Sequence, residues 1–222
     1  MSQRVNLYRE VHKGIRAMLS ELLRQSGRVD FSDAEALAKF RAEAHGIFEM
    51  LESHAHHEDT FVMPVVREVA LQVAQIIESA HVDQEAQLPE LLALLDSIDS
   101  SAPDAAHRGH TFVVKLARIS GELLLHMSDE EELIMPALHA AFTDDELNAI
   151  EQRLLASIPP EKMARFLGWM IPAINGSERV AMLAGMQAGA PAEVFAFVRE
   201  IARKALTPHE DAALDRALLA VW

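Results

Sequence analysis

The sequence predicts an all-α protein, an up-down antiparallel four-helix bundle with additional C-terminal helices. Of its 222 residues 50% are apolar, and β-branched residues never gather into the alternating runs that strands require. Apolar residues instead recur at steps of three and four in several long segments, as on the buried face of a helix. Glycine, proline and serine separate these segments, which indicates turns between helices.

The first two predicted helices carry ionisable residues inside their apolar stripes. The stripe of the first helix is Tyr8, His12, Ile15, Leu19 and Leu22. After a break at Gly27, Ser32 and Glu35 form a predicted capping box that opens the second helix. The stripe of this second helix is Ala44, Ile47, Leu51, His54, Glu58 and Phe61.

The third and fourth helices complete the predicted bundle. The third runs from about residue 68 to 95, and Pro89 is expected to kink or end it. Its inner face is Val73, Ile77, Gln84, Leu88 and Leu91. After a loop, the stripe of the fourth helix is Phe112, Leu116, Ile119, Leu123, His126, Glu130 and Leu133. Short connections between four helices favour an antiparallel bundle, to which we assign residues 1–142.

Residues 143–222 form a predicted C-terminal helical extension. Thr143 with Glu146, and Thr207 with Glu210, are two further capping boxes, and the pattern predicts four or five short helices. The extension is either a second domain or a set of helices packed along the bundle. It is also the candidate surface for a protein partner or for a homo-oligomer.

Composition excludes several classes of function. A formal charge of −14 argues against nucleic acid and anionic membrane surfaces as partners. No stretch approaches a membrane span, and the first residues lack the apolar core of a signal peptide, so we expect a cytoplasmic protein. The absence of cysteine excludes disulfides, Fe–S clusters and a thiol nucleophile. Any metal must therefore bind to nitrogen and oxygen.

Two segments of the chain look like copies of one another. In both, a glutamate follows a histidine by four residues and a proline follows it by ten; the copies are His54, Glu58 and Pro64, and His126, Glu130 and Pro136. His12 precedes the first copy by 42 residues, and His81 precedes the second by 45. An antiparallel arrangement of such a repeat brings four histidines and two glutamates together in the bundle interior.

This spacing suits a metal pair. Residues four apart on a helix lie about 40° apart around its axis, with Cβ atoms roughly 5–6 Å apart, so one helix can offer an imidazole and a carboxylate together. Nitrogen and carboxylate donors suit iron, manganese or zinc. Glu58 and Glu130 are the natural bridges between two ions. Because two buried carboxylates are costly alone, their stripe positions imply a counter-charge.

The repeat resembles the hemerythrin HHE family over about residues 5–142. The residues that carry the resemblance are HAHHED at 54–59 and HMSDEE at 126–131. The resemblance implies two iron ions joined by an oxo or hydroxo bridge. The positions that match the family's ligands are His12, His54, Glu58, His81, His126 and Glu130. The C-terminal extension also resembles that of some bacterial relatives, and no function comes with this likeness.

The chain departs from the five-histidine oxygen carriers of the family on its third helix. Those proteins place two histidines there, separated by three residues, whereas here Glu85 follows His81. A carboxylate in that place would favour the ferric state over reversible oxygen carriage. Glu131 is a second ambiguity, because oxygen carriers place their fourth-helix carboxylate five residues after the histidine.

Two more residues are candidates for a supporting role. His57 lies only about 60° from His54 around the helix and is an alternative ligand or a hydrogen-bonding neighbour, although an exposed flank is the commoner outcome. Tyr8 lies one turn before His12, where it either hydrogen-bonds an oxygen species or is a core aromatic with a satisfied hydroxyl. Three further histidines, His45, His56 and His110, are expected on the surface.

The first functional hypothesis is a di-iron protein that binds or reacts with a small diatomic molecule or a peroxide, such as oxygen, nitric oxide or hydrogen peroxide. Peroxidase, catalase-like or oxidase activity stays open. No phosphate-binding loop, nucleophile elbow or dinucleotide motif indicates a larger substrate. Two alternatives are a metal-responsive regulatory module that signals to a partner protein, and a zinc- or manganese-binding helical protein.

Overall fold

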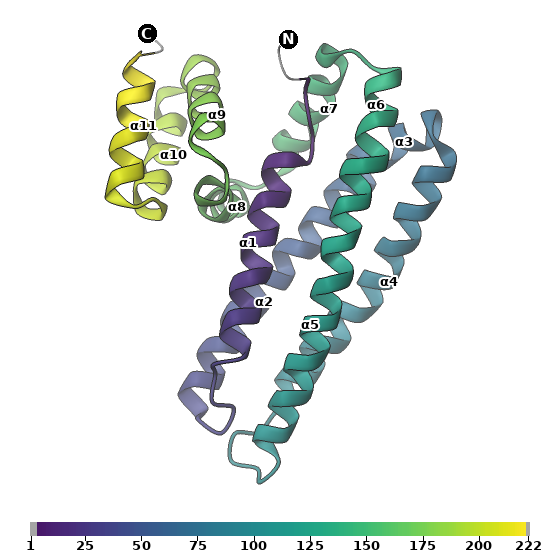
Figure 1. The fold of residues 1–222 in the computed structure, drawn as a ribbon, viewed down its shortest axis with the longest axis vertical. Helices are drawn as coiled ribbons and strands as arrows, with labels where there is room; N and C mark the ends of the chain where they lie inside the picture. Colours follow the sequence, from purple (N-terminus) through teal and green to yellow (C-terminus); the bar gives the residue numbers. More distant parts are fainter. Residues whose placement is uncertain (1–3, 221–222) are drawn as a thin grey trace. The chain divides into compact units, whose positions relative to one another are not determined.

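The computed structural model describes residues 4–220, and this part of the chain is helical with no strand (Figure 1). None of the helices in this range is long and apolar enough to span a membrane. In chain order the elements are α1 (Arg9–Ser26), α2 (Ala34–His57), η1 (Glu58–Val62), α3 (Met63–Val69), α4 (Leu71–Asp96), α5 (Ala105–Asp129), η2 (Glu130–Ile134), α6 (Met135–Ala141), α7 (Asp144–Ser157), α8 (Pro160–Ala173), α9 (Gly176–Gly189), α10 (Ala192–Ala205) and α11 (Pro208–Ala220). The predicted all-α class is confirmed.

The chain divides into two compact units. Among residues 4–220, the first contains the residues up to Tyr8 together with Met18–Ser157, and the second contains Arg9–Ala17 together with the residues from Ile158 onward. In the first unit, α2, α4, α5 and the later part of α1 run side by side in alternating directions (Figure 1). This is the predicted up-down bundle.

The N-cap of the second helix lies one residue after the predicted cap. Asp33 is the N-cap of α2, because its Oδ1 accepts hydrogen bonds from the backbone N–H groups of Glu35 at 2.9 Å and Ala36 at 3.0 Å. The predicted capping box at Ser32 is therefore wrong. Pro89 does not end the third long helix either, since α4 continues to Asp96.

Both copies of the sequence repeat contain one π-helical turn. These turns are η1 and η2, which begin at Glu58 and Glu130, and in each the backbone N–H of the residue after the turn donates to the carbonyl of that glutamate. Pro64 and Pro136 are the second residues after these turns. A proline lacks the N–H of an α-helical bond, and its ring clashes with the carbonyl four residues earlier, so a wider turn accommodates it.

The core of the first unit has two parts. Near the π turns, a cluster joins α3, α4, α6 and α7 around Tyr8, Val62, Met63, Val66, Ala74, Ile77, Ile134, Met135, Leu138, Leu147 and Ile150. Elsewhere the rings of Phe31, Phe40 and Phe112 lie 5.8–6.4 Å apart, and a Cβ at Gly109 would fall 2.2 Å from the Phe31 ring. Leu147 and Ile150 of the cluster near the π turns belong to α7. This helix, which the sequence analysis assigned to the extension, therefore packs within the first unit.

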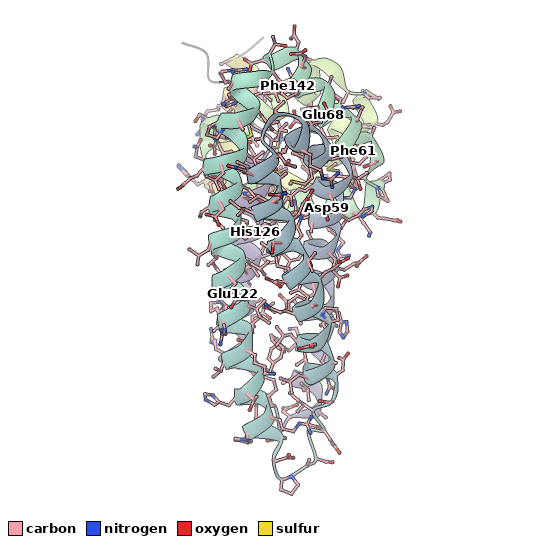
Figure 2. All side chains as sticks on the ribbon, turned by 90° about the vertical axis from the view of Figure 1, so that its right-hand side faces the viewer. Asp59, Phe61, Glu68, Glu122, His126 and Phe142 are labelled. Carbon is pink, nitrogen blue, oxygen red and sulfur yellow. The ribbon has the colours of Figure 1, made fainter. Side chains whose placement is uncertain are left out.

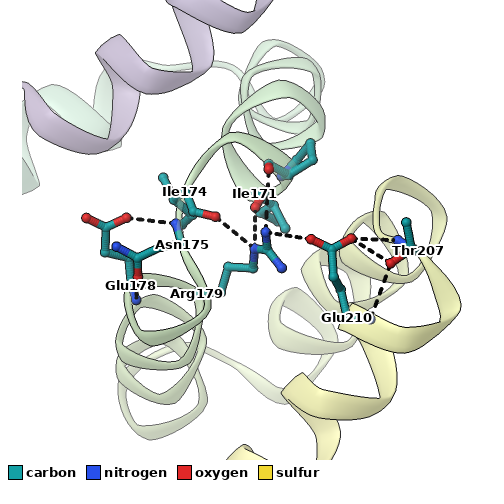
Figure 3. Close-up of polar contacts among 8 residues, drawn as sticks. Ile171, Ile174, Asn175, Glu178, Arg179, Thr207 and Glu210 are labelled. Atoms are coloured by element: carbon teal, nitrogen blue, oxygen red, sulfur yellow. Dashed lines mark hydrogen bonds and ion pairs between the residues drawn. The ribbon is translucent and has the colours of Figure 1, made fainter.

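The second unit surrounds its own apolar core. This core contains Leu167, Ile171, Leu183, Val198, Ala202, Leu206, Leu214 and Leu218. Arg179 of α9 links the end of α8 to the first turn of α11. Its Nε donates to the carbonyls of Ile171 at 2.9 Å and Ile174 at 3.0 Å, and its Nη2 donates to Glu210 Oε1 at 3.0 Å (Figure 3). The predicted capping box of Thr207 with Glu210 is confirmed, since Glu210 N donates to Thr207 Oγ1 at 3.3 Å.

Candidate metal centre

The candidate ligands come from one level of the bundle, where the π turns begin. His54 lies in the last turn of α2 and Glu58 opens η1; His126 lies in the last turn of α5 and Glu130 opens η2. His81 comes from α4. The two glutamates are among the most buried charged side chains described, with 3% of Glu58 and 1% of Glu130 exposed. Figure 2 shows the level of His126 and of Asp59, the residue after Glu58.

One group of candidate ligands lies within the first unit. It consists of Glu58, His81, His126 and Glu130, whose ligand atoms all lie within 4.8 Å of one another. His126 Nε2 is 3.2 Å from Glu130 Oε1, and His81 Nε2 is 3.5 Å from that oxygen and 3.6 Å from Glu58 Oε2. The rings of the two histidines meet edge to face, with centroids 4.8 Å apart.

A second group shares its carboxylates with the first. It consists of His12, His54, Glu58 and Glu130, with ligand atoms again within 4.8 Å of one another. His54 Nε2 lies 3.0 Å from Glu58 Oε1, and His12 is fully buried on α1. All six residues that the sequence analysis proposed as ligands thus fall into these two groups, and Glu58 and Glu130 are common to both.

The electrostatics of the centre favour a cation. Burial lowers the pKa of His81, but the hydrogen bond to Glu130, the charge of Glu58 and the contact with Asp59 outweigh it and raise this pKa to about 9. Burial raises the pKa of Tyr8 well above its usual value, and the charges of Glu58, Glu130 and Asp59 raise it further. Positive charge nearby would therefore stabilise the two buried carboxylates, and a proton or a metal ion can supply it.

The donor set fits a pair of metal ions. Four imidazoles and two carboxylates offer only nitrogen and oxygen, which suits iron, manganese and zinc. Carboxylates common to two groups suit two ions that share bridging ligands.

The comparison with protein families decides the family. The model of the hemerythrin HHE cation binding domain matches residues 3–138. This chain belongs to the hemerythrin HHE family. The HHE chain is also similar to the Zinc finger protein BRUTUS of Arabidopsis thaliana, with 23% identity over 192 residues; the match covers 84% of this chain and 15% of that protein's length. No solved structure matches this HHE chain.

The expectation for Glu85 in the HHE centre is corrected. Glu85 is exposed on α4 and belongs to neither group of candidate ligands among residues 4–220. The buried residues of α4 follow alternating steps of three and four residues, from Ala74 to Ile77 to His81, and the same steps resume from Leu88. Gln84, which is half-buried, continues this alternation after His81, so Glu85 lies about 100° away from it.

The other candidates around the HHE centre have different surroundings. His57 is buried rather than on an exposed flank: its Nδ1 pairs with the Ser53 carbonyl, and its ring stacks on Phe61 at 6.3 Å. Glu131 is half-buried, and like His57 it belongs to neither group among the described residues. Tyr8 is buried in the core cluster described above. As expected, the histidines His45, His56 and His110 are exposed.

Asp59 was missed from the sequence. Its Oδ1 lies 2.7 Å from His81 Nδ1, although the two residues are on different helical elements. The acidic residue was visible in the HAHHED motif, directly after Glu58. Its partner could not be deduced, because no spacing along the chain relates residue 59 to residue 81.

Proposed function

We propose that this HHE chain is a cytoplasmic protein that holds two iron ions and binds or reacts with a small neutral molecule such as oxygen, nitric oxide or hydrogen peroxide. The observation that supports it best is that Glu58 and Glu130 belong to both groups of candidate ligands. Under this proposal Glu58 and Glu130 would be shared by the two ions. His12 and His54 would hold one ion, and His81 and His126 would hold the other.

The residues beside the proposed ligands favour a small, uncharged reactant. Leu51 and Leu123 precede His54 and His126 by one turn, and only 5% and 6% of their surfaces are exposed. Such apolar neighbours disfavour water and charged molecules at the centre. When bound, a pair of iron ions supplies electrons to such a molecule or takes them from it. Buried imidazoles and carboxylates fix where the ions sit.

The likeness to a protein named a zinc finger does not carry a zinc-finger site to this chain. Zinc fingers bind their metal with cysteine, alone or with histidine, and this chain has no cysteine. Zinc or manganese bound by the imidazoles and carboxylates remains the alternative to iron, because the same donors suit all three metals.

The test is a metal analysis of the aerobically purified protein together with its ultraviolet-visible spectrum. We expect two irons per chain and the absorption bands of a bridged ferric pair. Glu130→Gln should lose most of this iron, whereas Glu132→Gln, which removes the same charge at an exposed position two residues away, should keep it. Zinc or manganese in place of iron, or equal iron in both variants, would contradict the proposal.

A regulatory module is a second candidate, which one feature of α1 favours. The segment Arg9–Ala17, which contains His12, is part of the second unit. Within that unit Lys13 Nζ lies 2.5 Å from Glu178 Oε1, and a Cβ at Gly14 would approach Met170 Cα to 3.1 Å. A metal bound by His12 would therefore hold a helix segment on which the C-terminal helices pack.

Amide hydrogen exchange distinguishes this second candidate. Exchange within α9 should slow when iron is added to the metal-free protein, because Glu178 in the first turn of α9 pairs with Lys13. Lys13→Ala should weaken this response and leave the iron content unchanged. If exchange in α9 is the same with and without metal, the regulatory candidate is rejected and the iron proposal is unaffected.

A further inference from the structure

The proposed ligand His81 has a contact with Asp59, a residue that belongs to neither group of candidate ligands. Asp59 Oδ1 lies 2.7 Å from His81 Nδ1. The His81 side chain is 6% exposed, whereas that of Asp59 is 47% exposed. A half-exposed carboxylate therefore holds the outward nitrogen of an otherwise buried imidazole.

This contact determines what the two ring nitrogens of His81 can do. A carboxylate only accepts hydrogen bonds, so Nδ1 must carry the proton that is shared with Asp59. In the neutral ring the lone pair is then on Nε2, which lies 3.6 Å from Glu58 Oε2 and 3.5 Å from Glu130 Oε1. Asp59 thus selects the tautomer in which the nitrogen that faces the carboxylates is free to bind a metal.

The position of Asp59 follows from the turn that carries it. Glu58 and Asp59 are successive residues of η1, and successive side chains of a helical turn point in directions far apart around its axis. Glu58 points into the centre, and Asp59 contacts α4 from the flank. One turn thereby supplies a proposed bridging ligand and the residue that orients a ligand from another helix.

We propose that Asp59 is a positioning residue for the metal centre: it fixes the tautomer and ring orientation of His81 and strengthens Nε2 as a donor, an inference that rests on the proposed function. Carboxylates that hydrogen-bond to a metal-binding histidine raise its basicity, and their loss typically lowers metal affinity by about 10–100-fold. The asparagine variant separates geometry from charge, because its carbonyl can still accept the Nδ1 proton.

The first measurement is the affinity for Fe(II), determined without oxygen by competition with a chelator. We expect Asp59→Ala to bind about 10–100-fold more weakly than the unaltered protein, and Asp59→Asn to lie between them. Asp83→Asn is the matched control, since Asp83 is an exposed carboxylate two residues from His81 on α4. Its affinity should be unchanged. Circular dichroism melting shows whether each variant is folded.

The second measurement reads the tautomer directly. In protein labelled with ¹⁵N at histidine and loaded with Zn(II), His81 should show a protonated Nδ1 in slow exchange with water. Asp59→Ala should lose this protected proton, and Asp59→Asn should keep it; a merely structural role would not move this signal.

The outcomes separate the two proposals. If Asp59→Ala keeps the full affinity and the protected Nδ1 proton, or if Asp83→Asn weakens binding equally, the role of Asp59 is wrong although the metal site stands. If the unaltered protein binds no metal, or if His81→Ala binds it as well as the unaltered protein, both proposals fail.

Discussion

At the scale of single residues, the rotation of α4 about its axis decides which side chains reach the centre. His81 is 6% exposed, and Ile77, one turn before it, is fully buried. Glu85, one turn after it, is exposed. The inward position after His81 belongs to Gln84, so an imidazole and a carboxylate four residues apart do not both face inward here, as they do at His54 and Glu58. We therefore expect the Glu85 carboxylate to add no ligand charge to the centre.

The exposure of Glu85 yields a prediction about metal binding. Glu85→Gln and Glu85→His should leave the iron content and the absorption spectrum unchanged, because the side chain at this position faces water. Glu58→Gln should reduce the iron content strongly, since Glu58 belongs to both groups of candidate ligands. Metal analysis of the three variants checks this. A loss of iron in Glu85→Gln comparable to that in Glu58→Gln would return Glu85 to the centre.

At the scale of elements, the two π turns shift the register of the buried stripe. The periodicity of the sequence places Phe61 and Leu133 on the inner face, but Phe61 is only half-buried and Leu133 is 37% exposed. Val62 and Ile134, one residue later, are buried instead. A wider turn needs more residues to return to the same face. In both copies the buried position therefore moves one residue toward the C-terminus.

This shift is tested by a matched pair of substitutions in η2. Ile134→Ala should destabilise the protein by about 2–5 kcal/mol, because it empties a fully buried site in the core cluster. Leu133→Ala should cost less than about 1 kcal/mol, since that side chain is exposed. Urea unfolding followed by circular dichroism gives both values. The opposite order would mean that the turn is an ordinary α-helical one.

The first turn of α11 provides a prediction about acid stability. Hydrogen bonds from the side chain and backbone of Thr207, together with Arg179, lower the pKa of Glu210 to about 2 from its usual 4.5. A carboxyl with a depressed pKa contributes stability that is complete above pH 4.5 and is lost as the pH falls toward 2. Glu210→Gln should therefore make the stability of the second unit less dependent on pH across this window.

Tryptophan fluorescence follows this unit in a Trp222→Phe background, since Trp169 lies on α8. The urea midpoints at pH 7 and pH 3 should differ less in Glu210→Gln than in the parent protein. Glu193→Gln, an exposed acidic position in the first turn of α10, is the control and should behave like the parent. Equal pH dependence in all three proteins would rule out Glu210 as the group responsible.

At the scale of the whole molecule, we expect metal binding to stabilise the fold. A protein with a formal charge of −14 that also buries two carboxylates gains by binding cations at that point. Metal that binds only the native state stabilises it by about 2.7 kcal/mol at a free concentration 100 times the dissociation constant. For a chain of this size that corresponds to roughly 5–10 °C in Tm.

Chelation tests this coupling. The metal-free protein should melt roughly 5–10 °C below the loaded protein under those conditions. Addition of Fe(II) without oxygen should restore the higher Tm, and metal analysis must verify that the chelated sample is empty. The comparison is read by calorimetry at one protein concentration. Identical melting curves for the two forms would show that the carboxylates have another source of compensation.

Local features of the fold could be predicted from the sequence because each depends on residues a few positions apart. Helical stripes, the capping boxes at Thr143 and Thr207 and the pairing of each glutamate with the histidine four residues before it all arise within one or two turns. The repeat then indicated which helices bring these pairs together. The family and the grouping of the six candidate ligands can therefore be predicted from the sequence.

Tertiary structure alone decided what depends on how whole helices rotate and pack. The contact of Asp59 with His81, the outward position of Glu85, the burial of His57 and the place of α7 in the first unit all belong to this class. A change of one residue turns a side chain by about 100°, and packing along the entire helix sets that angle. The types of candidate ligand and the helices that carry them follow from local sequence patterns. Packing between helices determined which neighbouring side chains reach them.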